Sequence, residues 1–371
     1  MKQQSYQDLS KKNLGKLPVW NLKDLYQSPN STNLKNDLNN LRLITKKFEK
    51  KYNNKIVKLS SKQLYQSIVE LEKIDIKIDK IMSYAHLLVA EDGNNEKNKI
   101  FYQQIQEQIT NIASSIIFYS LQLNQITETN LKRLISDSSL KNYKNWISNT
   151  RKFKPYQLDV QTEKLLQEKN ITSRSAWIRL FDDTIASLKF PFKGKELSSA
   201  EIFNFLSDKK ENNRKNAAKI VSSILKKNIK LFTTITNTLA KDKSINDSWR
   251  GLPNPVSYRN LSNVVEDEVV DALSNTVIEN YPKIAHRYYK IKAKWLKKKK
   301  LMYWDRNAPL PFQSQTIYSW NDAKDIVIEA YDQFDKRAGN IVKKFFDNSW
   351  IHAPVIPGKS PGAFAASTVP S

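Results

Sequence analysis

The side chains best suited to metal chemistry in this chain are three histidines, His86, His286 and His352. No two of them lie three to five residues apart, so no pair can hold zinc from successive turns of one helix. His86 stands among apolar residues in SYAHLLVA and is expected in the core or at an interface rather than as a ligand. His286 is expected on the surface, and His352, in WIHAPV, could approach a cleft. The histidines by themselves predict no metal site.

Other catalytic motifs are also missing from the sequence. There is no cysteine, which excludes disulfides, thiolate zinc sites and a cysteine nucleophile and suits a reducing cytosol. No Walker A loop, dinucleotide GxGxxG or GxSxG elbow occurs. The acidic runs 182–183 and 266–268 fall on expected helices, where acids favour the first turn, so they are interpreted as structural. Local motifs alone indicate a helical scaffold without an active site.

The last fifteen residues, PGKSPGAFAASTVPS (357–371), hold two of only seven glycines in the chain, Gly358 and Gly362. The segment has no helical period. A simple Pro/Gly turn between two elements is one interpretation of this composition, and spacing alone does not exclude it.

The formal net charge of +24 raises the question of an acidic partner. Nucleic-acid binding usually clusters charge and uses arginine, whereas here lysine is spread along the chain. We therefore expect the positive charge to reflect the lysine-rich composition of the whole chain, and nucleic acid is not the expected partner. The one dense cluster, RYYKIKAKWLKKKK (287–300), has eight basic and no acidic residues and is interpreted as the solvated face and end of a helix. A basic all-helical protein that binds nucleic acid or an acidic partner remains the alternative hypothesis.

The N-terminus has no apolar signal-peptide core, and no apolar run approaches the roughly 18 residues of a membrane span. We therefore expect a cytoplasmic protein without a membrane partner.

Hydrophobic periodicity predicts long helices as the elements that position these residues. Apolar residues step by three or four from Leu64 to Leu88 and again from Ile105 to Leu123. EDGNN (91–95) interrupts them with an expected C-cap glycine. The two stretches predict a long antiparallel helical hairpin whose apolar stripes pack on other elements.

The rest of the chain predicts further helices and one small hairpin. Helices are expected at about 127–148, 158–187, 199–208, 210–243, 263–297 and 321–347. A Lys-Gly turn between two short runs predicts a β-hairpin near 186–198. Ser198 and Glu201 then stand at capping-box spacing. The fold class is therefore mainly α.

Several collinear stretches resemble oligoendopeptidase F, a family of thimet-oligopeptidase-like zinc peptidases. They are LPVWNLKDLY (17–26), similar to LPxWDLxDLY; RKFKPYQLDVQTEKLL (151–166), with Tyr156 in place of the usual histidine; AWIRLFDDTIASLKFPFKGKELS (176–198); RKNAAKI (214–220); NTLAKDKSINDSWRGLPNPVSYRN (237–260); HRYYKIKAKWLKKKKLMYWDRNAPLP (286–311), with lysines in place of the glycine usual after KWL; and the segment 345–371. Because they span essentially the whole chain in family order, chance is a poor explanation.

The resemblance implies an elongated, helical zinc-oligopeptidase-like fold with a channel for short unfolded peptides. It divides the chain into an N-terminal lead-in and helical hairpin (1–125), a helical domain with the small β-hairpin (126–205) and the first, incomplete part of a catalytic domain (206–371). Gly358, Gly362, Ala363 and Phe364 match the family's PGKxPGAF and are the substrate-channel candidates.

The resemblance also implies that the catalytic groups are elsewhere. In the family, H-E-x-x-H supplies two zinc ligands and the general base, and a later glutamate supplies the third ligand. That motif does not occur in this chain, so we expect no catalytic or metal residue here and a missing C-terminal catalytic half. The complete protein is expected to be a zinc-dependent endopeptidase acting on short peptides. The present chain is expected to be inactive alone and to expose apolar surface. Oligomeric state and peptide specificity stay open.

Overall fold

The computed structural model describes residues 14–312, 317–354, 356, 359 and 362–368, and helix dominates them. Short 3₁₀ turns include η5 (Phe205–Ser207) and η7 (Tyr303–Asp305). The helices and strands are α2 (Thr32–Tyr52), α3 (Ser61–Glu91), α4 (Glu96–Ser114), α5 (Phe118–Gln125), α6 (Glu128–Ile135), α7 (Lys144–Lys152), α8 (Val160–Lys169), α9 (Arg174–Ser187), β1 (Phe190–Phe192), β2 (Lys195–Leu197), α10 (Ser199–Asn204), α11 (Glu211–Lys227), α12 (Ile229–Arg250), α13 (Ser257–Ser262), α14 (Asp267–Asn280), α15 (Arg287–Trp295), α16 (Trp320–Phe334) and α17 (Lys336–Asp347). The mainly α prediction is confirmed.

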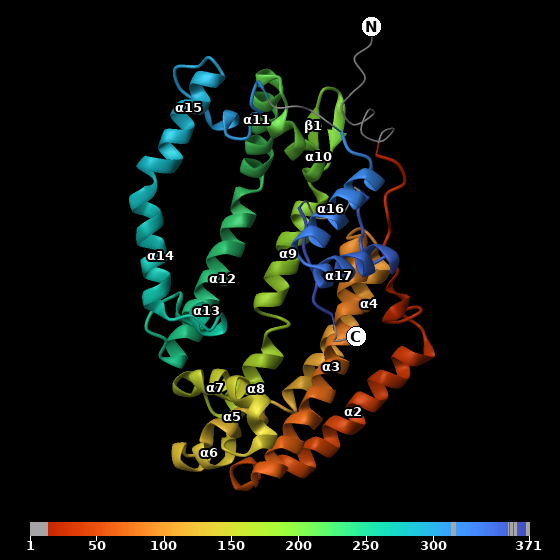
Figure 1. Cartoon of the computed structure of the whole chain (residues 1–371), viewed down its shortest axis with the longest axis vertical. Coiled ribbons are helices and arrows are strands. Elements are labelled where there is room, and N and C mark those ends of the chain that lie inside the picture. The colour runs from red at the N-terminus through yellow and green to blue at the C-terminus, as the bar shows by residue number, and fades with distance from the viewer. Residues whose placement is uncertain (1–13, 313–316, 355, 357–358, 360–361, 369–371) are drawn as a thin grey trace.

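The molecule is elongated, with long helices running along its length (Figure 1). The helices α2, α3 and α4 lie along one side, and α14 and α15 lie along the other. The short helices α5 to α8 gather at one end, while β1, α10 and the start of α11 gather at the opposite end. This elongated helical architecture agrees with the fold that the sequence resemblance implied.

The predicted helical hairpin is formed by α3 and α4. A capping box starts α3, because Ser60 accepts from the backbone of Gln63 and the Gln63 side chain accepts from the backbone of Ser60. The expected C-cap glycine is wrong: the cap is Asp92, in an extended conformation. The second helix ends at Ser114 rather than running to Leu123, because Ser114 and Ser115 bond back to helix carbonyls and compete with the helical ladder.

The hairpin packs its apolar stripes into a large first core. Its buried members run from Tyr26 in the lead-in, through α2 to α5, to Ile147 on α7. Ile68, Ile81 and Leu123 are almost fully buried within it. This core continues across residue 125, where the sequence suggested a boundary, and the three-part division stays a prediction.

A second, smaller core lies under the β-hairpin. Strands β1 and β2 pair antiparallel with Phe190 opposite Leu197. The turn residues Lys193 and Gly194 both have positive φ, at 52° and 74°, as a two-residue type I′ hairpin turn requires. Phe190, Phe192 and Leu197 pack with Ile202 of α10 and Ala217 of α11. The predicted hairpin and the Ser198–Glu201 capping box are both confirmed.

A bidentate ion pair ties α8 to the end of α12. Arg250 donates to the two carboxylate oxygens of Glu163 at 2.6 and 2.7 Å and also to the carbonyl of Tyr156. Burial raises the pKa of Glu163, but hydrogen bonds from Arg250 and the Leu158 backbone outweigh it and hold the pKa below its usual value. The planar guanidinium and carboxylate fix the relative orientation of the two helices.

A more deeply buried pair ties α11 to the segment after α15. Arg214 donates to Asp305 at 2.7 Å, and the two side chains are 3% and 0% exposed. The remaining Arg214 donors reach the carbonyls of Trp304, Asp208 and Lys209. Burial raises the pKa of Asp305, but hydrogen bonds from Lys298 and Arg214 outweigh it and lower the pKa. Every charge in this pair is therefore compensated by hydrogen bonds, as burial demands.

Five of the expected helices are interrupted. The helix expected over 127–148 is divided into α6 and α7 by a 3₁₀ segment (138–143), and that expected over 158–187 is divided into α8 and α9 by the turn 170–173. The helix expected over 210–243 breaks at Asn228, and that over 263–297 passes through a π-helical turn, Pro282–His286. Proline lacks the N–H that a regular α-helix needs, which accounts for the π-helical turn at Pro282. The helix expected over 321–347 ends at Asp335, whose extended backbone and side chain cap the start of α17.

Apolar side chains are exposed mainly in the later helices. No side chain of α14 is buried, and Val269, Leu273 and Ile278 are each more than half exposed. On α16, Ile326 and Phe334 are likewise exposed. The exposed apolar surface expected from the resemblance is present on these helices. Among the described residues, no helix is both long enough and apolar enough to span a membrane.

Replacing Asp305 by alanine is expected to lower the free energy of unfolding by about 3–5 kcal/mol, because Arg214 would be left as a buried, unpaired charge. Chemical denaturation with helix content as the signal measures the change. The matched control is Glu266→Ala, since the Glu266–Lys152 pair is 65% and 37% exposed and such pairs contribute little. Equal stability of the two variants would contradict the anchoring role of Asp305.

Candidate substrate-channel segment

The segment after α17 runs beside the N-terminal lead-in. The Asn21 backbone N–H donates to the carbonyl of Ser349 at 2.8 Å, and the Ala353 N–H donates to the carbonyl of Pro18 at 3.0 Å. The indole of Trp350 donates to Asp24 at 2.9 Å. In Figure 1 the blue segment beyond α17 passes over α3 and α4. Two of the stretches that resemble the family, at opposite ends of the sequence, therefore meet in space.

The substrate-channel candidates within the described residues lie on this surface. Gly362, Ala363 and Phe364 are exposed, whereas Gly358 falls outside the described residues. Gly362 has a φ of 100°, a conformation that favours glycine. The ring of Phe364 lies 6.5 Å from that of Trp20 and 6.0 Å from that of His86. The three candidates thus form an accessible strip with one aromatic side chain anchored on the lead-in and α3.

His86 is exposed on α3 rather than held in the core, which corrects part of the sequence interpretation. Its ring lies 6.3 Å from Tyr102 and contacts the terminal segment through Phe364. It is an interface residue between α3, α4 and that segment. His286 is exposed, as expected.

His352 is the most buried titratable group of the segment, with its side chain only 3% exposed. Lys359 Nζ lies 2.9 Å from His352 Nδ1 and also donates to the carbonyls of His352 and Pro354. An ammonium has only donors, so Nδ1 accepts and the neutral ring carries its proton on Nε2. That nitrogen lies 3.8 Å from Glu91 Oε1, at the end of α3.

Glu91 joins the terminal segment to the lead-in. Its other oxygen, Oε2, accepts from the indole N–H of Trp20 at 3.1 Å, and the Trp20 ring lies 5.1 Å from that of His352. Burial lowers the pKa of His352, the charge of Lys359 lowers it further, and Glu91 opposes them. The arrangement holds His352 neutral and fixes the segment that leads to Gly362. Sequence reasoning missed Trp20, Glu91 and Lys359, although two of these lie in stretches that resemble the family.

These residues do not form a zinc site. Among the described residues, no group of three histidine, cysteine, aspartate or glutamate side chains is close enough to hold a metal ion. His352 has one carboxylate beside it, and its second nitrogen faces a lysine. No hydrolytic step through zinc can be built from the residues described.

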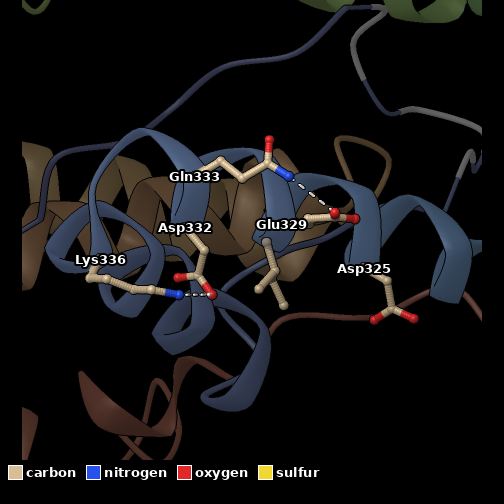
Figure 2. Close-up of a pocket in the computed structure, with 6 residues that line it drawn as sticks. Asp325, Glu329, Asp332, Gln333 and Lys336 are labelled. Carbon is tan, nitrogen blue, oxygen red and sulfur yellow. Dashed lines mark hydrogen bonds and ion pairs between the residues drawn. The ribbon is translucent and has the colours of Figure 1, made fainter.

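A separate open pocket of about 500 Å³ lies on α16. Figure 2 shows Asp325, Glu329 and Asp332 extending from this helix, with Gln333 donating to Glu329 and Lys336 beside Asp332. Asp332 also pairs with Lys343 of α17 at 2.9 Å, and that hydrogen bond lowers its pKa. Because two of these acids are already paired, the pocket is interpreted as the polar contact between α16 and α17.

Comparison with known proteins identifies what the fold resembles. The family model described as Oligopeptidase F matches residues 122–190. Oligopeptidase PepF of Bacillus subtilis (strain 168) is 24% identical over 94% of this chain and 52% of its own length. The resemblance to the oligoendopeptidase F family is confirmed.

Solved structures agree with the oligoendopeptidase F fold. The oligoendopeptidase-F of Enterococcus faecium has a TM-score of 0.67 at 19% identity, covering 85% of this chain and 60% of that one. PZ peptidase A, solved with an inhibitor, has a TM-score of 0.67 at 14% identity, covering 92% of this chain and 58% of that one. The chain thus spans between half and two thirds of the length of each of these three proteins.

Acid is expected to destabilise the docked terminal segment of this oligoendopeptidase F-like chain. The pKa of His352 lies below its ordinary value of 6.5 in the folded state, so the unfolded state takes up the proton first. The stabilising contribution is present above about pH 6.5 and is lost as the pH falls through the folded-state pKa. Thermal melts from pH 8 to pH 5 measure this loss.

The difference in melting temperature between the wild type and His352→Gln, followed against pH, isolates the contribution of this one group. His352→Gln is expected to reduce the fall in melting temperature between pH 6.5 and pH 5. His286→Gln, at an exposed position, is expected to leave that fall unchanged. An unchanged fall in His352→Gln would contradict the assignment.

Proposed function

We propose that this chain is the N-terminal part of a zinc-dependent oligoendopeptidase that hydrolyses internal bonds of short, unfolded peptides. The observation that carries the proposal is the alignment with Oligopeptidase PepF over 94% of this chain. The fold shared with the oligoendopeptidase-F structure supports it. The lack of cysteine supports a reducing, cytoplasmic setting.

In this proposal the chain contributes scaffold and channel wall, and the zinc ligands lie outside it. The described residues offer no ligand set, so neither a zinc ligand nor a general base is assigned here. Zinc is expected for the complete enzyme only.

Gly362, Ala363 and Phe364 are proposed to contact the peptide substrate. The strip is exposed, and its first two residues are too small to keep an extended peptide away from the backbone. Phe364, supported by Trp20 and His86, offers an apolar contact for a substrate side chain. The buried link of His352 to Lys359 and Glu91 would hold this strip in place.

The 371-residue chain alone is expected to bind no stoichiometric zinc and to cleave no quenched-fluorescent peptide. Supplying a C-terminal segment that bears H-E-x-x-H, in cis or in trans, is expected to give cleavage that a chelator abolishes. Metal analysis and a fluorogenic peptide assay measure the two properties. A restored protein that binds zinc one to one and cleaves no peptide would overturn the proposal.

In the restored enzyme, Phe364→Ala is expected to lower kcat/KM by about tenfold, since removing an apolar contact of this size costs roughly 1.5 kcal/mol. Leu43→Ala is the matched control, because Leu43 is 60% exposed on α2, away from both the strip and the exposed apolar helices. Steady-state kinetics on one peptide compare the two. The same kcat/KM in both variants would contradict the proposed contact between Phe364 and the substrate.

A further inference from the structure

The basic segment Arg287–Lys300 is only partly the solvated helix face that its sequence suggested. Lys292 is buried and donates to the carbonyl of Arg306 at 2.7 Å. Lys298 contacts Asp305 at 2.6 Å and also pairs with Glu211. These two lysines hold α15 and η7 together, and their charges are used inside the fold.

The other six basic residues of the segment are exposed, and among the described residues none of them has an acidic partner. This set is called the α15 basic face and consists of Arg287, Lys290 and Lys294 on α15 together with Lys297, Lys299 and Lys300 in the segment directly after it. Like charges at such spacing repel one another. A polyanion bound along the face would remove that repulsion. In Figure 1, α15 lies at one extremity of the molecule, away from α2 and α3.

Exposed aromatic rings flank the α15 basic face. At 100° per residue, Arg287, Lys290 and Lys294 share one stripe of the helix, and Tyr288 and Trp295, about two turns apart, share a second stripe roughly a third of the way round the helix. Tyr288 is 42% exposed and Trp295 is 41% exposed. Trp295 is held edge-on by Phe312 at 5.2 Å, and Tyr303, at 63% exposure, lies in the segment that follows.

We propose that the α15 basic face binds single-stranded nucleic acid. A row of cations that follows a phosphate backbone, with rings beside it on which bases stack, is the combination that sequence-tolerant single-strand binding uses. An acidic peptide would use the lysines but not the rings, because the negative face of an aromatic ring repels carboxylates. Single-strand binding is independent of peptide hydrolysis. It differs from the expectation in the sequence analysis that nucleic acid is not a partner, which rested on lysine being spread along the whole chain.

The test is fluorescence anisotropy of labelled dT20 with the 371-residue protein across a salt series. Lys297→Gln/Lys299→Gln/Lys300→Gln is expected to weaken binding at least tenfold and to reduce the salt slope by about 2, since each single-strand phosphate contact contributes roughly 0.7. Lys46→Gln/Lys47→Gln/Lys50→Gln, three exposed lysines of α2, is the control with the same net charge. It is expected to leave the salt slope and affinity near those of the wild type.

A second variant tests the rings independently of the charge. Tyr288→Leu/Trp295→Leu is expected to weaken dT20 binding about tenfold while leaving binding of poly-glutamate unchanged. Circular dichroism checks that each variant keeps its helix content.

Three results would overturn the proposal. One is no dT20 binding at low salt. Another is equal loss in the α15 and α2 triple variants, which would indicate the diffuse charge of the whole chain. The last has two parts: Tyr288→Leu/Trp295→Leu leaves dT20 affinity unchanged, and the wild type binds dT20 no more tightly than poly-glutamate. That result would indicate a site for acidic polypeptides.

Discussion

The ion pair between Arg214 and Asp305 fixes the half of the molecule that has little apolar core. The second core is small, and α14 and α16 bury no side chain. Packing alone therefore does little to define where α15 and η7 lie. Arg214 donates to four acceptors, three of them backbone carbonyls, and such geometry permits one arrangement of the surrounding segments.

The stretches that resemble the oligoendopeptidase F family mark fold contacts more than chemistry. Glu163 lies in one such stretch, and its partner Arg250 lies in another. Arg214 and Asp305 come from two further stretches. The two pairs link residues 87 and 91 positions apart in the sequence. The resemblance therefore supports the scaffold strongly, while the described residues contain no cluster of side chains that could hold a metal ion.

Much of the fold could be predicted from sequence patterns within single segments, because interactions between residues close in sequence determine those helices and turns. The α3–α4 hairpin follows from apolar periodicity, and the β-hairpin follows from the Lys-Gly turn. The break at Asn228 has no comparable signal, and Pro282 is tolerated by a π-helical turn that a simple period does not anticipate. At the candidate site, Gly362 and Phe364 could be named from the resemblance. Their neighbours Trp20 and Glu91 could not, because nothing local encodes a contact between distant segments.

The contact between Trp350 and Asp24 joins residues 326 positions apart in the sequence. On a ribosome Asp24 emerges long before Trp350, so this one contact cannot form while α2 to α16 are made. Closing so long a loop carries a large entropic cost unless the intervening helices have already shortened the span. The segment after α17 is thus expected to dock after α2 to α16 have folded, and the state before docking would expose Trp20 and Glu91 to chaperones and proteases.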